Sequence, residues 1–437
     1  MLCFIICYAA AFLFARASHY IPSGLVLLFG TAVLAAEDMR GSGLPVRLRA
    51  VFTLGFAGGQ GLSCMKLSRL QTDWEPLTWA VLFLAVMVFR LVFELLKQRS
   101  VRVRSSEMNG ADSGARAENG ACGSLTELKR NRLFLSIAGI CLISWAAFFT
   151  EAKLLGYVPL FLRGVPHAYS WFHVSGLHYF TVSCALIPAL SVVFFETEPG
   201  AGHIRKTIVL LCCVCAFLIP VLCVSRSQMI LAAMLAGITF ATLRGGKVPL
   251  FGGACAGAGL LLLYVLLTAA RSHSVDYLNE IFEMKYRLPI FVSQPYIYIS
   301  NNYDNLNCLI RDLHAHSMGI RMLFPVWALT GLKFLYPSLT AWPLYLTKEE
   351  LTTLTLFYDA WYDFGTAGVV LFSGALGAVS FFLEKRMRET HGPVLHVVFA
   401  QMAAYFALSF FTTWFSNPAT WFYFAETLAV WLFCRKH

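Results

Sequence analysis

Side chains that could move protons or bind anions gather in residues 300–321, SNNYDNLNCLIRDLHAHSMGIR. On a helix, Asp304, Asn307, Arg311 and His314 would share one face, and leucines would cover the other face. A face that combines Asp, Arg and His suits proton transfer and anion binding. An amphipathic helix at a membrane surface, with its polar face in water, explains the same spacing. The pattern leaves both interpretations open.

Other arginines lie near the ends of apolar segments. Arg226 stands between serines in VSRSQ, and Arg287 follows Lys285 in YLNEIFEMKYRLPIF. Arg271 and Arg321 lie on either side of the latter segment. Each arginine could bind a phosphate in bidentate fashion, or simply anchor the chain at a membrane interface by snorkelling. A charge at membrane depth favours the functional interpretation for Arg226.

A pair of carboxylates precedes one late apolar segment. In TLTLFYDAWYDFGTAGVVLF, Asp359 and Asp363 are four residues apart and so share one helical face beside aromatic residues. Repulsion at this spacing can raise the pKa of one carboxyl group, which predicts a role as a base. Gly365 and Gly368 would allow close packing where the helix begins.

Metal and nucleotide chemistry find no support in the motifs. Arg163, His167, His173 and His178 lie among aromatic residues in 156–180, but the histidine spacing is not that of a zinc site. The sequence contains no P-loop and no nucleophile-elbow motif. We therefore predict no metal and no cofactor, while sugar stacking on Tyr169 or Trp171 fits the aromatic content.

Composition shows what must position these residues. Of the 437 residues, 58% are hydrophobic and 13% are charged, whereas a soluble domain carries about 25% charged residues. The sequence predicts an all-α, polytopic membrane bundle. Stretches long enough to cross a bilayer indicate twelve spans, at about 2–16, 20–36, 50–66, 77–96, 133–150, 176–195, 208–224, 227–243, 249–270, 365–383, 394–413 and 420–434.

Charge placement sets the expected orientation. Twenty of the 34 lysines and arginines fall in loops on one side, which predicts that side, and both termini, to be cytoplasmic. The net charge of +10 then reflects topology, and nucleic-acid binding is excluded. Within the spans, Arg90 is expected to pair with Glu94.

Five regions follow from the spans. They are N-terminal transmembrane helices (1–96), a disordered cytoplasmic linker (97–132), central transmembrane helices (133–270), a large helical extracytoplasmic loop (271–364) and C-terminal transmembrane helices (365–437). The extracytoplasmic loop holds seven of the cations and nine carboxylates, and long structured loops are usually functional.

The order of these features resembles a known family. An outer loop with LLGYVPLF, the VSRSQ turn, a large late outer loop and then LTTLTLFYDAWYDFGTAGVVLF are together similar to the Wzy-type oligosaccharide repeat-unit polymerases of bacterial surface polysaccharides. The likeness covers roughly residues 130–415, and Arg226 and the segment from Tyr362 to Gly368 match best.

The resemblance implies a metal-independent glycosyltransferase of the bacterial cytoplasmic membrane. It would join repeat units carried on undecaprenyl pyrophosphate, with a flippase and a chain-length regulator as partners, to build O-antigen, capsule or exopolysaccharide. Arg226, Arg287, Arg311, Arg271 and Arg321 would bind the pyrophosphate, and His314, Asp304 or Asp363 would act as the base. An O-antigen ligase-type transferase and a flippase or transporter of lipid-linked oligosaccharide stay as alternatives.

Overall fold

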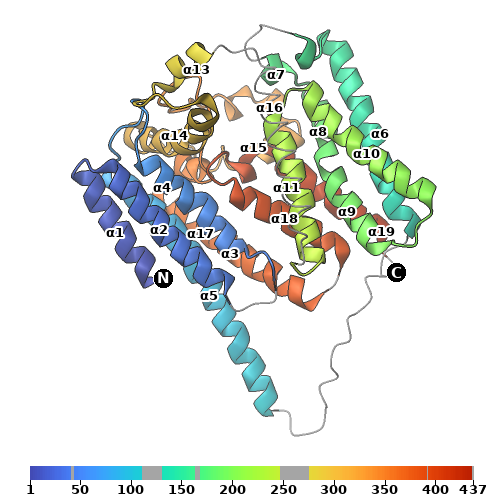
Figure 1. The fold of residues 1–437 in the computed structure, drawn as a ribbon, viewed down its shortest axis with the longest axis horizontal. Helices are drawn as coiled ribbons and strands as arrows, with labels where there is room; N and C mark the ends of the chain where they lie inside the picture. The colour runs from blue at the N-terminus through green and yellow to red at the C-terminus, as the bar shows by residue number, and fades with distance from the viewer. Residues whose placement is uncertain (41–43, 111–129, 163–167, 247–274, 391, 436–437) are drawn as a thin grey trace.

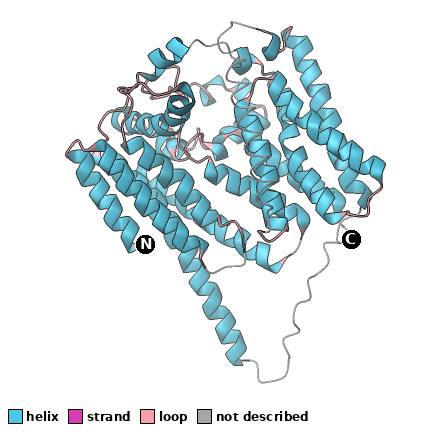
Figure 2. Ribbon diagram, in the orientation of Figure 1, coloured by secondary structure: helices cyan, strands magenta, loops and turns pink. Residues whose placement is uncertain are grey.

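A computed structural model of the chain describes residues 1–40, 44–110, 130–162, 168–246, 275–390 and 392–435. Across these ranges the regular elements are helices, and Ser68 and Met284 form an isolated β-bridge. Figure 2 shows this helical content directly. The predicted all-α class is confirmed for the described residues. In a bilayer a helix satisfies its own backbone polar groups, which explains why apolar segments of this length fold this way.

The described residues include seven helices that are long and apolar enough to cross a membrane. They are α2 (Tyr20–Met39), Pro76–Arg102 within α5 (Pro76–Gly110), Asn131–Leu155 within α6 (Arg130–Leu155), the continuous run of α8 (Leu177–Val182), η3 (Ser183–Leu186) and α9 (Ile187–Thr197), α10 (His203–Leu222), α11 (Arg226–Leu243) and α17 (Tyr358–Glu389). The chain is therefore a helical membrane protein by length and composition of its helices. Twelve spans stay a prediction, and the one at 249–270 lies outside the described residues.

Shorter helices occupy the other predicted spans. They are α1 (Leu2–Arg16), the run of α3 (Leu48–Phe52), η1 (Thr53–Ala57) and α4 (Gly58–Cys64), α18 (Pro393–Ala407) and α19 (Pro418–Cys434). The glycine-rich third segment is helical as far as Cys64 and has a π-helical turn in its middle. A β-carbon on Gly55 would lie 2.2 Å from the carbonyl oxygen of Phe406, so glycine lets this run press against α18.

Short helices cover one end of the bundle. They are α7 (Ala168–Trp171), α13 (Val275–Phe282), α15 (Phe324–Leu329), α16 (Leu332–Leu335) and the turns η2 (Pro159–Phe161), η4 (Pro337–Leu339) and η5 (Trp414–Ser416), beside the longer α14 (Ile290–Asp312). In Figure 1 most of them lie toward the top, while both termini and the free end of α5 lie toward the bottom. The described part of the predicted 271–364 loop lies at this end and contains α13, α14, α15, α16 and η4, and its place outside the membrane stays a prediction.

The polar stretch of α14 departs from expectation. The helix ends at Asp312, so the predicted helical face does not reach His314. Every residue from Ser300 to Leu309 is buried, on the polar and apolar faces alike. Of the two interpretations left open, the surface helix with a solvated polar face does not fit this stretch, because α14 packs against α4 and buries these polar groups in contacts with other segments.

Buried ion pairs join helices near the opposite end. Arg90 pairs with Asp38 of α2, not with Glu94 as expected. Glu94, whose side chain is 38% exposed, pairs with Arg49 and Lys97 instead. A buried carboxylate such as that of Asp38 is costly without a positive partner, whereas Glu94 is solvated by water. Pairing Arg90 with Asp38 is therefore the more stable arrangement.

The predicted linker at 97–132 is shorter than expected. Helix α5 continues to Gly110 and α6 begins at Arg130, so both ends of this segment are helical. The prediction of disorder between them falls on residues 111–129, which lie outside the described ranges.

Close contact between α5 and α17 gives a first test of the packing. A β-carbon at Gly377 would lie 2.4 Å from the carbonyl oxygen of Phe89, whereas one at Gly374 would meet valine methyl groups at 3.5 Å or more. We expect Gly377→Ala to lower the free energy of unfolding by about 1–3 kcal/mol, because the helices must separate. Denaturant titration in detergent measures it, with Gly374→Ala as the matched control. Equal midpoints for both variants would contradict the packing described.

Candidate functional site

A cavity with two adjoining lobes lies at the capped end of the bundle. The histidine lobe, about 470 Å³, is bounded by α8, the turn before α11 and the start of α19. The arginine lobe, about 790 Å³, is bounded by the start of α17 and the segment from Arg321 to Leu344. Five residues line both lobes: Phe324, Lys333, Thr412, Asn417 and Pro418. The shared walls make the two lobes parts of one site.

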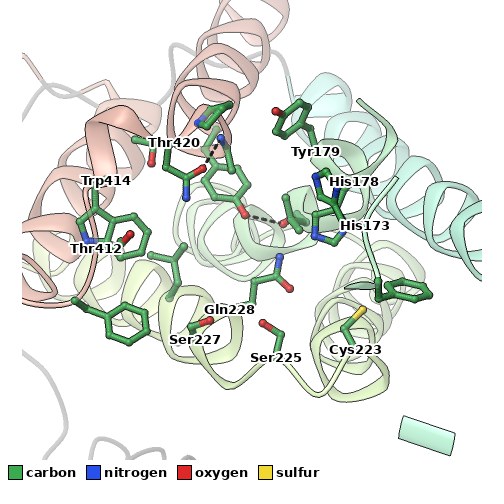
Figure 3. A pocket seen from close by; sticks show the side chains of 18 of the residues that line it. His173, His178, Tyr179, Cys223, Ser225, Ser227, Gln228, Thr412, Trp414 and Thr420 are labelled. Carbon is green, nitrogen blue, oxygen red and sulfur yellow. Dashed lines mark hydrogen bonds between the residues drawn. The ribbon is translucent and has the colours of Figure 1, made fainter. Parts of the chain in front are cut away.

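The two histidines of the histidine lobe come from the loop before α8 and from its first turn. In Figure 3, His173 and His178 lie beside each other, across the hollow from Thr412 and Trp414. Their ring centroids are 5.0 Å apart. Gln228, at the start of α11, completes the wall between the two sides. The lobe therefore sets imidazoles opposite an aromatic and hydroxyl-bearing wall.

Glu151 of α6 holds His178 in place. Its side chain is fully buried, and its Oε1 lies 3.1 Å from Nδ1 of His178. The backbone N–H of Val174 and the hydroxyl of Thr181 also donate to this carboxylate, at 3.0 and 2.7 Å. With Nδ1 engaged, Nε2 of His178 is left for the cavity, and the ring is 25% exposed. This carboxylate–histidine pair has the arrangement of an oriented general base.

His173 has a perturbed proton affinity. Partial desolvation lowers its pKa below the usual 6.5, and the nearby His178 and Lys333 lower it further. The ring is therefore neutral at pH 7, so it adds no positive charge beside His178.

The arginine lobe takes its charge from Arg321. Its Nε donates to Oδ1 of Asp359 at 2.6 Å, and its guanidinium carbon lies 4.7 Å from the ring centroid of Tyr362. In the described part of the chain, its two terminal nitrogens make no hydrogen bond. Asp359 and Arg321 both line the lobe, and the ring contact fixes the plane of the guanidinium. Arg321 thus presents donors at the cavity surface.

Asp363 positions Arg321 through its backbone. Its fully buried carboxylate accepts the hydroxyl of Ser317 and the N–H groups of Arg321 and Met322, the latter at 2.7 Å. The predicted shared face of Asp359 and Asp363 is confirmed, because both carboxylates hold the same segment. Gly365, with φ of 59°, breaks the helix just after them, a conformation that favours glycine.

Lys333 of α16 lines both lobes. Its ammonium lies 5.0 Å from the ring of Phe334, and among the described residues it makes no ion pair. A half-buried cation without a carboxylate partner attracts anions. Lys333 and Arg321 therefore give the cavity two cationic groups.

The structure gathers only some of the predicted anion-binding arginines. Arg321 lines the cavity, whereas Arg226 is buried at the start of α11 with its Nη1 3.1 Å from Oε1 of Gln294. Arg226 nonetheless stands between Ser225 and Ser227, which line the histidine lobe. Arg311 and Arg287 are exposed and line neither lobe, and Arg311 pairs with Asp312. Arg271 lies outside the described residues.

The three predicted bases are dispersed. Asp363 lies beneath Arg321, as described, while Asp304 is buried in an ion pair with Lys66 at 2.7 Å. His314 is exposed in the segment after α14. Neither Asp304 nor His314 lines the cavity.

Sequence reasoning did not select Glu151, His178 or Lys333. A glutamate directly after the predicted span at 133–150 was the available signal for the first, since charged groups at membrane depth usually have a partner or a function. Because Glu151 and His178 are 27 residues apart in the chain, their spacing does not predict that they pair. No motif in the sequence sets Lys333 apart from the other cations of the 271–364 loop.

The site can bind an anionic group next to an oriented base, and it offers neutral polar groups around them. Among the described residues, no group of three or more His, Cys, Asp and Glu side chains could hold a metal ion. No family model matches this chain, and no curated protein or solved structure matches it.

Proposed function

We propose that this protein is a glycosyltransferase that polymerises oligosaccharide repeat units carried on undecaprenyl pyrophosphate into a surface polysaccharide. The observation that carries the proposal is the two-lobed cavity, where two cations face a space next to a carboxylate-held histidine. The family resemblance of the sequence supplies the substrate class. The reaction needs no metal and no nucleotide sugar.

The charge chemistry of such a reaction fits the arginine lobe. The donor's pyrophosphate gains negative charge as it leaves the sugar, and cations fixed at that point stabilise the transition state. Arg321 and Lys333 take this role. Arg226 supports the wall of the neighbouring lobe, next to the lining residues Ser225 and Ser227.

In the proposed topology, the twelve-span bundle lies in the bacterial cytoplasmic membrane. The cavity then opens on the outer face, and both termini lie in the cytoplasm. The positive-inside distribution of the loops supports this orientation, because the loops joined at the far end from the cavity carry most of the lysines and arginines. A flippase would deliver the substrate, and a chain-length regulator would act on the product.

Analysis of lipid-linked glycans from a deletion strain tests the function. We expect polymer to be lost and single-repeat lipid intermediates to accumulate on the outer leaflet, where a glycosidase added to spheroplasts degrades them. Complementation with the intact chain is the control. Long unligated polymer would point instead to a ligase, and intermediates protected from the glycosidase would point to a flippase. Either result would overturn the proposal.

A further inference from the structure

We infer that the histidine lobe is the subsite for the acceptor sugar, and that His178 is the base that accepts the proton of its attacking hydroxyl. Glu151 is the residue that positions this base. The inference rests on the proposed function and deepens it by dividing the cavity between the two substrates.

The hydrogen bonds of Glu151 fix which nitrogen of His178 is basic. A backbone N–H and a hydroxyl both donate hydrogen bonds to this buried carboxylate. An ionised carboxylate only accepts, so a third group that contacts it must also be a donor. Nδ1 of His178 lies 3.1 Å from Oε1 of Glu151 and is therefore the protonated nitrogen that donates to it. The lone pair of the neutral ring is then on Nε2, and the ring lines the lobe. When Nε2 takes a proton, the adjacent carboxylate stabilises the imidazolium.

The lining of the histidine lobe suits a sugar better than a phosphate. Ser225, Ser227, Gln228 and Thr412 offer neutral donors and acceptors, and Tyr179 adds an aromatic surface. Figure 3 shows Thr412 across the hollow from the histidines, Ser225, Ser227 and Gln228 between the two sides, and Tyr179 next to His178. Such a mixture of neutral hydrogen-bonding groups and aromatic rings is what a hydroxyl-rich ligand needs. Lys333, which lines both lobes, places a positive charge at their junction, where the leaving group would be.

The chemical step balances without a co-reactant. An acceptor hydroxyl oxygen attacks the anomeric carbon of the donor and forms the new glycosidic bond. The bond from that carbon to the phosphate oxygen breaks, and the lipid pyrophosphate leaves with the electron pair, facing Arg321 and Lys333. The hydroxyl proton goes to Nε2 of His178, which later releases it to solvent through its exposed edge.

Purified full-length protein in proteoliposomes tests the assignment, with the lipid-linked single-repeat glycan from the deletion strain as the probe. We expect His178→Ala to lower kcat about 100-fold or more, because general-base catalysis contributes that much. Added imidazole should restore part of the rate, since it replaces the missing proton acceptor. Glu151→Gln should lower kcat at least about tenfold with KM unchanged, and Glu151→Asp should recover some of the loss. His203→Gln, an exposed histidine at the far end, is the control.

The outcomes separate the two proposals. If the wild-type protein forms no polymer from this probe, the proposed function fails. If the wild-type protein is active and folded His178→Ala keeps its rate, the function stands and the base assignment is overturned. Loss of activity that imidazole does not restore, with a shifted unfolding midpoint, would also overturn the assignment, because it would make the Glu151–His178 pair structural.

Discussion

Replacing Lys333 by alanine is expected to slow polymer formation about 100-fold without weakening the fold, because removal of one preorganised group that stabilises developing charge costs that much. Lys333 lines both lobes and makes no ion pair among the described residues, so its loss leaves no buried carboxylate behind. Lys333→Arg keeps the positive charge and should keep most of the rate. Initial rates in proteoliposomes measure the effect, and the exposed Arg205→Ala at the far end is the control.

Arg321 extends the same prediction. Arg321→Ala should cost a similar factor in kcat, but it also leaves the buried Asp359 without its partner. The double variant Arg321→Gln with Asp359→Asn removes both charges and separates catalysis from folding. We expect it to fold normally and to be as slow as Arg321→Ala. Wild-type rates in both Lys333→Ala and this double variant would contradict the proposed pyrophosphate site.

Local spacing was enough to find part of the site. Asp359 and Asp363 follow each other on one turn of helix, so their common face was visible in the sequence, and the structure shows both holding the Arg321 segment. Arg321 itself was one of five candidate arginines. Nothing in the sequence distinguishes it from Arg311. The two differ only in the folded chain, where Arg321 pairs with the buried Asp359 at the cavity and Arg311 pairs with the exposed Asp312.

The spacing of polar residues along a helix also does not show whether their face contacts water or protein. The spacing of Asp304 and Asn307 correctly placed them on one side of a helix, but equally fits a face in water and a face against protein. Asn307 in fact accepts from the backbone of Glu75 and the hydroxyl of Thr78, more than 200 residues away. Such pairings depend on the tertiary arrangement.

The base of the proposed reaction shows the same limit. His178 is unremarkable among the histidines of its segment until Glu151 is placed beside it. The helices α6 and α8 bring the two together across a loop, part of which the structure does not describe. The apolar composition that fixed the membrane class and most helix positions carries no information about this contact.

The buried pair of Lys66 and Asp304 has the largest expected effect on stability. Lys66 is 5% exposed and Asp304 1%, and the carboxylate also accepts from Trp74, Gln71 and Ser63. These contacts tie the segment after α4 to the middle of α14. The backbone of Lys66 has φ of 49°, a strained value for any residue other than glycine, so the surrounding contacts must hold it in that conformation.

Asp304→Asn is therefore expected to lower the free energy of unfolding by about 3–5 kcal/mol, because it keeps the shape but leaves a buried ammonium without a counter-charge. Denaturant titration in detergent measures it. Asp312→Asn, which breaks an exposed pair on the same helix, should cost less than about 1 kcal/mol. Adding Lys66→Met to Asp304→Asn removes the stranded charge and should recover more than half of the loss. If Asp304→Asn and Asp312→Asn cost the same, the pair is not the structural tie that its burial implies. If the second substitution recovers nothing, the cost lies in the hydrogen bonds from Trp74 and Gln71 rather than in the charge.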